Sequence, residues 1–252
     1  VADDGSTLFR AAIRGGLSEI VQDLLLRGSD ANELVGSNGR TVLHEASMRG
    51  WHGIASALMA NGANVHTRDE NGQTPLHLSN TGEVVDILVK NGADVDAIDS
   101  HDRTPLHELG SVSVAQALLK NGAFIDAVDV DNRTPLYIAV ENGEDDVVEY
   151  FLQNGADVNV RGVDGQTPLF HCRSETKAKI LLAFGAQPDA IDKSGKTPLD
   201  HLASSALNLY AMKVGHLLAA AVGNLDIHVA AGLGMIEAVR KLIRLDTEAV
   251  TS

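Results

Sequence analysis

The sequence predicts an all-α fold, a solenoid of about seven to eight stacked helix-turn-helix repeats joined by short β-hairpin loops. Two markers recur along the chain with the same period, and chance does not produce such agreement. Successive markers of either kind are separated by 30, 30, 33 and 30 residues. The 4% share of aromatic residues suits helices packed around small side chains. Thr-Pro-Leu starts at Thr74, Thr104, Thr134, Thr167 and Thr197, and Gly-Ala starts at Gly62, Gly92, Gly122, Gly155 and Gly185.

Each unit contains the signals for two helices and a loop. Thr before Pro marks a helix start, because the hydroxyl caps free N–H groups and Pro suits the first turn. Gly50 and Gly143 are predicted to end first helices, and the apolar run 147–152 has the spacing of a second helix. Gly155 stands where a left-handed cap ends that second helix. The polar run 157–165 then forms the loop to the next unit.

The sequence resembles the ankyrin repeat family over roughly residues 4 to 200. Two stretches match the family's signature nearly residue for residue: 69–77, with the sequence DENGQTPLH, and 91–96, with the sequence NGADVD. The resemblance implies an L-shaped stack of helix pairs with projecting β-hairpins. It also implies that partner proteins bind the hairpin tips and the inner face of the first helices.

The repeats are expected to form one array over residues 1–252, with two irregular ends. Residues 1–33 are interpreted as a degenerate N-terminal cap in which Arg10 and Arg14 face water, and residues 34–196 as regular repeats. The units that start at Thr74, Thr104 and Thr167 are three residues short, which predicts a truncated first helix or turn. Residues 197–252 are atypical. Either 214–223 forms a first helix there, or, as we favour, 227–231 and 236–243 form the last pair.

Composition narrows the class of partner and compartment. A formal net charge of −14 disfavours nucleic acid and anionic membranes as partners. No apolar run is long enough to span a bilayer, and no signal peptide is evident. One cysteine, Cys172, permits no internal disulfide, which fits a reducing cytoplasmic or nuclear compartment. The chain begins at Val1, as an excised piece would, and we expect a monomer.

The residues with catalytic potential have better structural explanations. His44, His77 and His107 recur at one repeat position, but Tyr137, Phe170 and Asp200 follow there, which a metal ladder would not tolerate. In the family that the sequence resembles, this histidine bonds the backbone and ties adjacent loops. Cys172 occupies a small-residue position and is expected to be a packed, inert thiol beside His171. The carboxylate pairs, such as Asp145-Asp146, lie in no predicted apolar pocket. We therefore expect no enzyme activity, cofactor or metal.

The residue before each repeat threonine is the main binding candidate. With Thr41, which begins the sequence TVLH 33 residues before Thr74, there are six such residues. Four of the six are basic on an acidic chain, which predicts a groove for an acidic or carbonyl-rich peptide. The alternative is that long polar side chains only cover the loops. Trp51 either anchors an interface or packs under a neighbouring turn. The expected partner-binding residues are Arg40, Trp51, Gln73, His101, Arg103, Val130, Asp131, Arg133, Val163, Gln166, Lys193 and Lys196.

The predicted function is thus a protein-interaction scaffold that binds a protein or peptide. The alternative is the targeting arm of a larger multidomain enzyme, or of a bacterial effector that is injected into a host cytosol.

Overall fold

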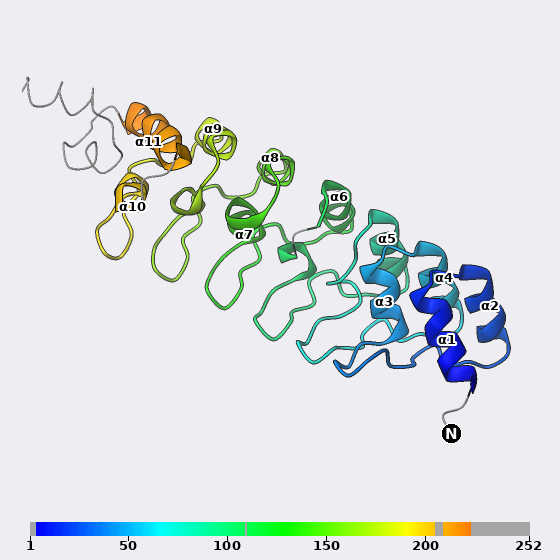
Figure 1. Ribbon diagram of the computed structural model, residues 1–252. Helices are drawn as coiled ribbons and strands as arrows, with labels where there is room; N and C mark the ends of the chain where they lie inside the picture. Colours follow the sequence, from blue (N-terminus) through cyan, green and yellow to red (C-terminus); the bar gives the residue numbers. More distant parts are fainter. Residues whose placement is uncertain (1–3, 109, 205–208, 223–252) are drawn as a thin grey trace, which may run out of the picture. The chain divides into compact units, whose positions relative to one another are not determined.

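The computed structural model describes residues 4–108, 110–204 and 209–222 (Figure 1). The chain forms two compact units that meet in sequence between Val130 and Asp131. Both units consist of repeats in which a second helix follows a first helix or a shorter turn, and the loops of each unit project to one side (Figure 1). Seven second helices can be counted in the described residues, namely α2, α4, α5, α6, α8, α9 and α11. No helix in this part of the chain is long and apolar enough to cross a membrane.

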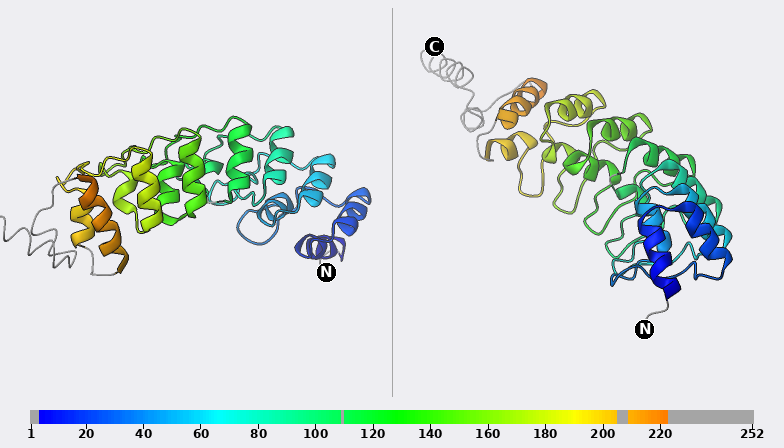
Figure 2. Two further views of the ribbon diagram at one scale, coloured as in Figure 1. Left: turned by 90° about the horizontal axis from the view of Figure 1, so that it is seen from above. Right: turned by 45° about the vertical axis from the view of Figure 1, so that its right-hand side comes forward.

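In the first unit the second helices α2, α4, α5 and α6 each contact the next one, forming a row (Figures 1 and 2). The first helices α1 and α3 contact each other beside that row. The elements are α1 (Asp4–Arg14), α2 (Ser18–Leu26), α3 (Val42–Met48), α4 (His52–Ala60), α5 (Gly82–Lys90), the 3₁₀ turn η1 (Pro105–His107) and α6 (Val112–Lys120).

The second unit repeats the arrangement. Its first elements α7, η2 and α10 contact one another in order, and α9 contacts both α8 and α11. The elements are α7 (Pro135–Asn142), α8 (Asp145–Gln153), the 3₁₀ turn η2 (Pro168–His171), α9 (Glu175–Ala183), α10 (Pro198–Ser204) and α11 (Leu209–Val222).

The predicted helix signals act largely as expected. The Thr134 hydroxyl accepts a hydrogen bond from the Tyr137 backbone N–H, and Pro135 occupies the first turn of α7. Gly155 is left-handed (φ +91°) after α8, as predicted. Gly143 also ends α7, but its backbone is extended. A Cβ there would lie 2.7 Å from the Ala139 carbonyl oxygen, so close approach, and not handedness, requires glycine.

The short units lose their first helix, as the sequence predicts. Residues 75–78 form only turns, and the units at Thr104 and Thr167 contain the 3₁₀ turns η1 and η2. In the second unit Lys177, on the α9 helix that follows η2, is buried. Its ammonium donates to the carbonyl oxygens of Val140 (3.3 Å) and Gly143 (2.6 Å) at the end of α7. A lysine thus satisfies carbonyl groups that a helix end leaves free.

The loops are hairpin-like turns and not regular strands. Among the described residues the β pairing is limited to one isolated bridge, between Leu34 and Thr41. The other loops are closed by single backbone hydrogen bonds, for example from Asp69 N–H to the Gln73 carbonyl (2.9 Å).

The first repeat is a helix pair whose outer face carries exposed apolar as well as charged side chains. Arg14 is exposed as predicted, and Arg10 pairs with Glu33 at 2.5 Å while its side chain stays 43% exposed. Ile20 is 44% exposed, although the residue at its repeat position in the next unit, Ile54, is 0% exposed. Leu8 is exposed in the same way. An apolar face that neighbouring repeats cover elsewhere is therefore open here.

The last described repeat excludes one of the two alternatives weighed for residues 197–252. Residues 209–222 form α11, which packs on α10 and on α9. It is therefore the second helix of the unit that starts at Thr197, and 214–223 is not a first helix. The favoured alternative over 227–243 lies outside the described residues.

Candidate partner-binding surface

Buried aspartates hold the loops of the first unit in shape. The Oδ1 atom of Asp99 accepts hydrogen bonds from the backbone N–H groups of His101 (2.7 Å) and Arg103 (3.0 Å). Asp69 makes the same pair of bonds one repeat earlier, to Asn71 and Gln73. The aspartates therefore fix the backbone of each loop tip through its N–H groups. The side chains at the tips take no part in these bonds and can differ between repeats.

Buried histidines tie each loop to the next. The Nδ1 atom of His77 accepts from the Thr74 backbone N–H (3.1 Å), so Nε2 carries the proton and donates to the Arg103 carbonyl (3.0 Å). His44 makes the equivalent bonds to Thr41 and Gln73. Burial lowers the pKa of both imidazoles. The predicted structural role of these histidines is confirmed.

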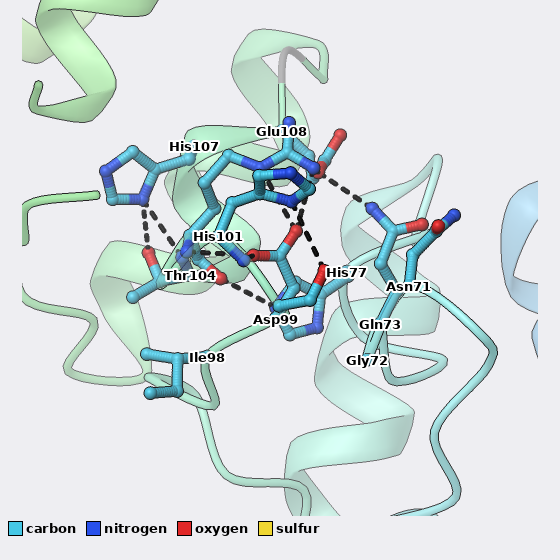
Figure 3. A network of polar contacts seen from close by, with 12 residues as sticks. Asn71, Gly72, Gln73, His77, Ile98, Asp99, His101, Thr104, His107 and Glu108 are labelled. Atoms are coloured by element: carbon cyan, nitrogen blue, oxygen red, sulfur yellow. Dashed lines mark hydrogen bonds and ion pairs between the residues drawn. The ribbon is translucent and has the colours of Figure 1, made fainter. Parts of the chain in front are cut away.

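Asp99, Glu108 and Gln73 belong to a closed polar network in the first unit (Figure 3), which Arg103 completes. Arg103 is at the centre of its ion pairs. It contacts Asp99 at 2.7 Å and Glu108 at 3.4 Å, and Gln73 donates to Glu108 at 2.9 Å. Burial raises the pKa of Glu108. Burial also opposes ionisation of Asp99, but hydrogen bonds from Arg103 and the backbone outweigh it and lower the pKa. The charge of Arg103 is balanced inside the unit.

The other residues before the repeat threonines are also engaged. Arg40 pairs with buried Asp69 at 3.0 Å, and Arg133 contacts Asp131 at 3.1 Å. Gln73 and Gln166 are buried. Lys196 is exposed, and its backbone N–H is bonded to Asp192. The arginine and glutamine side chains thus engage groups of the chain itself, as the covering role weighed in the sequence analysis requires, and the three arginines each face a carboxylate. The Lys196 side chain is the exposed exception among these six positions.

In the second unit Asp192 organises the loop before α10. Bonds from the Lys196 backbone N–H and the Ser194 hydroxyl hold the pKa of Asp192 well below its usual range. Its other oxygen lies 2.9 Å from His201 and 3.3 Å from the amide of Gln166. This loop is therefore as rigidly anchored as those of the first unit.

A pocket of about 190 Å³ opens in the second unit, between the loop around Val163 and the first elements α7 and η2. The Tyr137 hydroxyl lies 2.7 Å from His171 Nε2. Glu141 carboxylate oxygens lie 3.9 Å from the Arg133 guanidinium and 3.8 Å from His171 Nδ1. Burial lowers the pKa of His171. The lining residues are Asp131, Arg133, Tyr137, Glu141, Gly162, Val163, Asp164 and His171.

Sequence reasoning selected three of the pocket residues but missed Tyr137, Glu141 and His171 as members of a site. A signal was present at the fourth position after each repeat threonine. There His171 replaces the Ile138 of the preceding repeat on the inner side of the first element. Tyr137 stands at the repeat position of the recurring histidines. Only the fold shows that its hydroxyl contacts His171 of the next repeat.

The loop tips expose most of the side chains predicted for them. His101, Val130, Asp131, Val163 and Lys193 are all exposed, and they differ in size and charge. Additional apolar side chains that the sequence analysis did not single out are exposed on the loops of the first unit, namely Ile98, Phe124 and Val128. Exposed apolar groups on rigid loops are typical of interaction surfaces.

Trp51 packs against its own structure. Its ring lies so close to Gly16 that a Cβ on this glycine would stand 2.9 Å from the indole. The Arg49 guanidinium carbon lies 5.1 Å from the ring centroid. Trp51 is half-buried, and packing under the neighbouring turn is the role that the structure supports.

Cys172 is a packed thiol. It is 1% exposed, and its sulfur contacts the Ser174 carbonyl at 3.2 Å. Burial raises its pKa to about 11, which keeps the thiolate rare at neutral pH. His171 points its Nε2 at Tyr137, so the two neighbours in sequence form no nucleophile and base pair. Among the described residues no group of histidines, cysteines and carboxylates could hold a metal ion.

This combination of a repeated buried frame with varied exposed tips defines a helical repeat scaffold of the protein-binding class. The family model described as ankyrin repeats (3 copies) matches residues 8–99 and 79–162, and the chain belongs to the ankyrin repeat family. The human ASB11 ankyrin repeat domain has a similar crystal structure. Its TM-score is 0.71 at 27% identity, covering 83% of this chain and 96% of that one.

Two curated relatives are similar over one segment each. The 2-5A-dependent ribonuclease of Mus musculus is 40% identical over 75 residues, which is 30% of this chain and 10% of that protein. The BCL-6 corepressor-like protein 1 of Homo sapiens is 37% identical over 73 residues, or 29% of this chain and 4% of that protein. The matched segments thus span a tenth or less of these relatives.

Proposed function

We propose that this protein is a non-catalytic interaction module that binds another protein through its loop tips and the inner face of its first helices. Ankyrin repeats are in general protein-interaction modules, and the chain has their frame. The observation that carries the proposal is the contrast between anchor and tip. Asp99 is buried, and its carboxylate accepts several hydrogen bonds from its own loop. His101, two residues further on, is exposed, and Asp131 stands at its repeat position in the next loop.

The surface favours a polypeptide partner over a small metabolite. The exposed tips combine apolar Val130 and Val163 with polar Lys193 and His101, a mixture that suits an extended or helical segment of another protein. The net charge of −14 disfavours nucleic acid and anionic membranes as partners. A monomer in a reducing compartment of the cell fits the single buried thiol of Cys172.

Affinity capture with a matched pair of variants tests the proposal. The tip variant carries His101→Ala, Val130→Ser, Val163→Ser and Lys193→Ala, all at exposed positions that leave the buried anchors intact. The control variant carries the same kind of change on exposed faces of second helices, at Lys90, Gln116 and Thr176.

A partner that the unaltered protein and the control capture, and that the tip variant loses, supports the proposal. Equal capture by all three proteins would place binding elsewhere and refute it. Circular dichroism spectra and melting temperatures of the variants establish that the loss reflects binding and not unfolding.

A further inference from the structure

We propose that the pocket of the second unit binds the guanidinium group of an arginine side chain that a partner peptide presents. The inference rests on the proposed function, because it specifies what one part of the binding surface recognises. It concerns the cavity of about 190 Å³ between α7, η2 and the loop around Val163. Its basis is the contrast between this pocket and the closed network of the first unit.

The first unit shows what a completed site of this kind looks like. Glu108 is held there by the Gln73 amide at 2.9 Å and by the Arg103 guanidinium at 3.4 Å. The Glu108 carboxylate is therefore already bound by an arginine and an amide of the chain itself. The second unit has no equivalent bond at Glu141 within the described residues. Its carboxylate lies 3.8–3.9 Å from its two basic neighbours, beyond hydrogen-bonding distance.

The charge of the pocket is negative. Asp131, Glu141 and Asp164 contribute three carboxylates, against the single guanidinium of Arg133. His171 adds no lasting positive charge at neutral pH, because burial lowers its pKa. A cationic group inserted between Glu141 and Asp164 would relieve this imbalance. An anionic group would meet three like charges, so the pocket opposes the acidic partner that the residues before the repeat threonines suggested.

The shape and walls favour arginine over lysine. The rings of Tyr137 and His171 lie 5.0 Å apart at 45°, and they form one wall of the pocket. A planar guanidinium stacks on such rings and offers five N–H donors, which two separated carboxylates can share. Lysine offers a compact ammonium with three donors and no planar face to stack on the rings. Val163, 53% exposed at the rim, would contact the methylene stem of the incoming side chain.

The test is an NMR titration of the ¹⁵N-labelled full chain with the probe acetyl-Gly-Arg-Gly-amide. Matched probes carry Lys or Gln in place of Arg. We expect saturable shifts of the backbone amides at Gly162 and Val163 with the Arg probe, weaker shifts with Lys and none with Gln. Glu141→Gln removes a charge-assisted bond and should weaken binding about tenfold. Glu108→Gln, in the closed network of the first unit, should leave the affinity unchanged.

A second variant protects the test against misfolding. Asp164→Asn keeps the oxygen that accepts the Gln166 N–H at 3.1 Å and removes only the charge, so it should also weaken binding while the spectrum stays folded. Equal binding of the Arg and Gln probes, shifts away from the pocket, or unchanged affinity in both pocket variants would overturn the inference. Such a result would leave the capture experiment untouched, because that experiment depends on the loop tips of the whole protein.

Discussion

Replacement of His77 by alanine should remove about 2–4 kcal/mol of folding free energy. In the folded chain His77 is 3% exposed and joins two buried backbone groups, the Thr74 N–H at 3.1 Å and the Arg103 carbonyl at 3.0 Å. The variant leaves the Thr74 N–H without a partner, which costs about 1–3 kcal/mol, and it removes one hydrogen bond of the Arg103 carbonyl, which costs about 1 kcal/mol more. That carbonyl still accepts from the Asp99 N–H at 2.9 Å. The total free energy of unfolding of a domain is only about 5–15 kcal/mol, so this loss is a large fraction of it.

Urea denaturation at pH 7.5, followed by circular dichroism, measures the change. His101→Ala is the matched control, because His101 is exposed and should change stability by no more than about 0.5 kcal/mol. Amide hydrogen exchange gives a local readout: protection of the Thr74 N–H should fall in the His77 variant and persist in the control. A loss below about 1 kcal/mol, with Thr74 still protected, would refute the assigned bridging role.

Three further predictions concern the pH dependence of stability and two pairs of residues at matched repeat positions. Because burial lowers the pKa of the bridging histidines below 6.5, their contribution to stability is complete above pH 6.5. It is lost as pH falls toward the folded-state pKa, by up to about 1.4 kcal/mol per pH unit and group, and flat stability in urea melts from pH 7.5 to 5.5 would contradict it. Ile54→Ala should lower the free energy of unfolding by about 2–5 kcal/mol, because the side chain is buried. Ile20→Ala should lower it by well under half of that, because Ile20 is exposed at the same repeat position. Similar losses of stability in thermal melts of the two variants would show that the outer face is covered. Asp102 has a left-handed backbone (φ 57°) where other repeats have glycine, so Asp102→Gly should stabilise the fold by about 0.5–1 kcal/mol. Asn132→Gly (φ 59°) should not stabilise it, because the Asn132 side chain donates to the Arg161 carbonyl. Equal effects of the two variants on the melting temperature would refute this distinction.

The repeated positions made most of the fold readable from the sequence. Thr134, Pro135 and Gly155 act on their own backbone neighbours, so their effects are local and recur every 30 or 33 residues. The truncated first helices followed from counting residues. The register after Thr197 stayed open in the sequence because the unit breaks the period, and apolar spacing alone does not distinguish the first helix of a pair from the second.

The candidate site depended on contacts between repeats, which spacing does not reveal. Arg40, Arg103 and Arg133 stand at one repeat position and appeared equivalent as charges. The structure separates them by their partners: Arg103 closes a network with Glu108, while Arg133 borders an open pocket beside Glu141. The net field at a charged group depends on the groups within a few ångströms. For Arg103 these are Asp99 and Glu108, close by in sequence, whereas the partner of Arg40 is Asp69 of the next repeat.

The sequence by itself determined the repeat frame, the family and the loop positions that vary, because helix caps, turns and apolar periodicity act over a few residues. Only the tertiary structure decided which charges are compensated, that Trp51 packs on Gly16, and that Tyr137 and His171 form the wall of a pocket. Those properties arise where one repeat is stacked on the next, and the stacking brings together side chains whose separation in sequence hides their proximity.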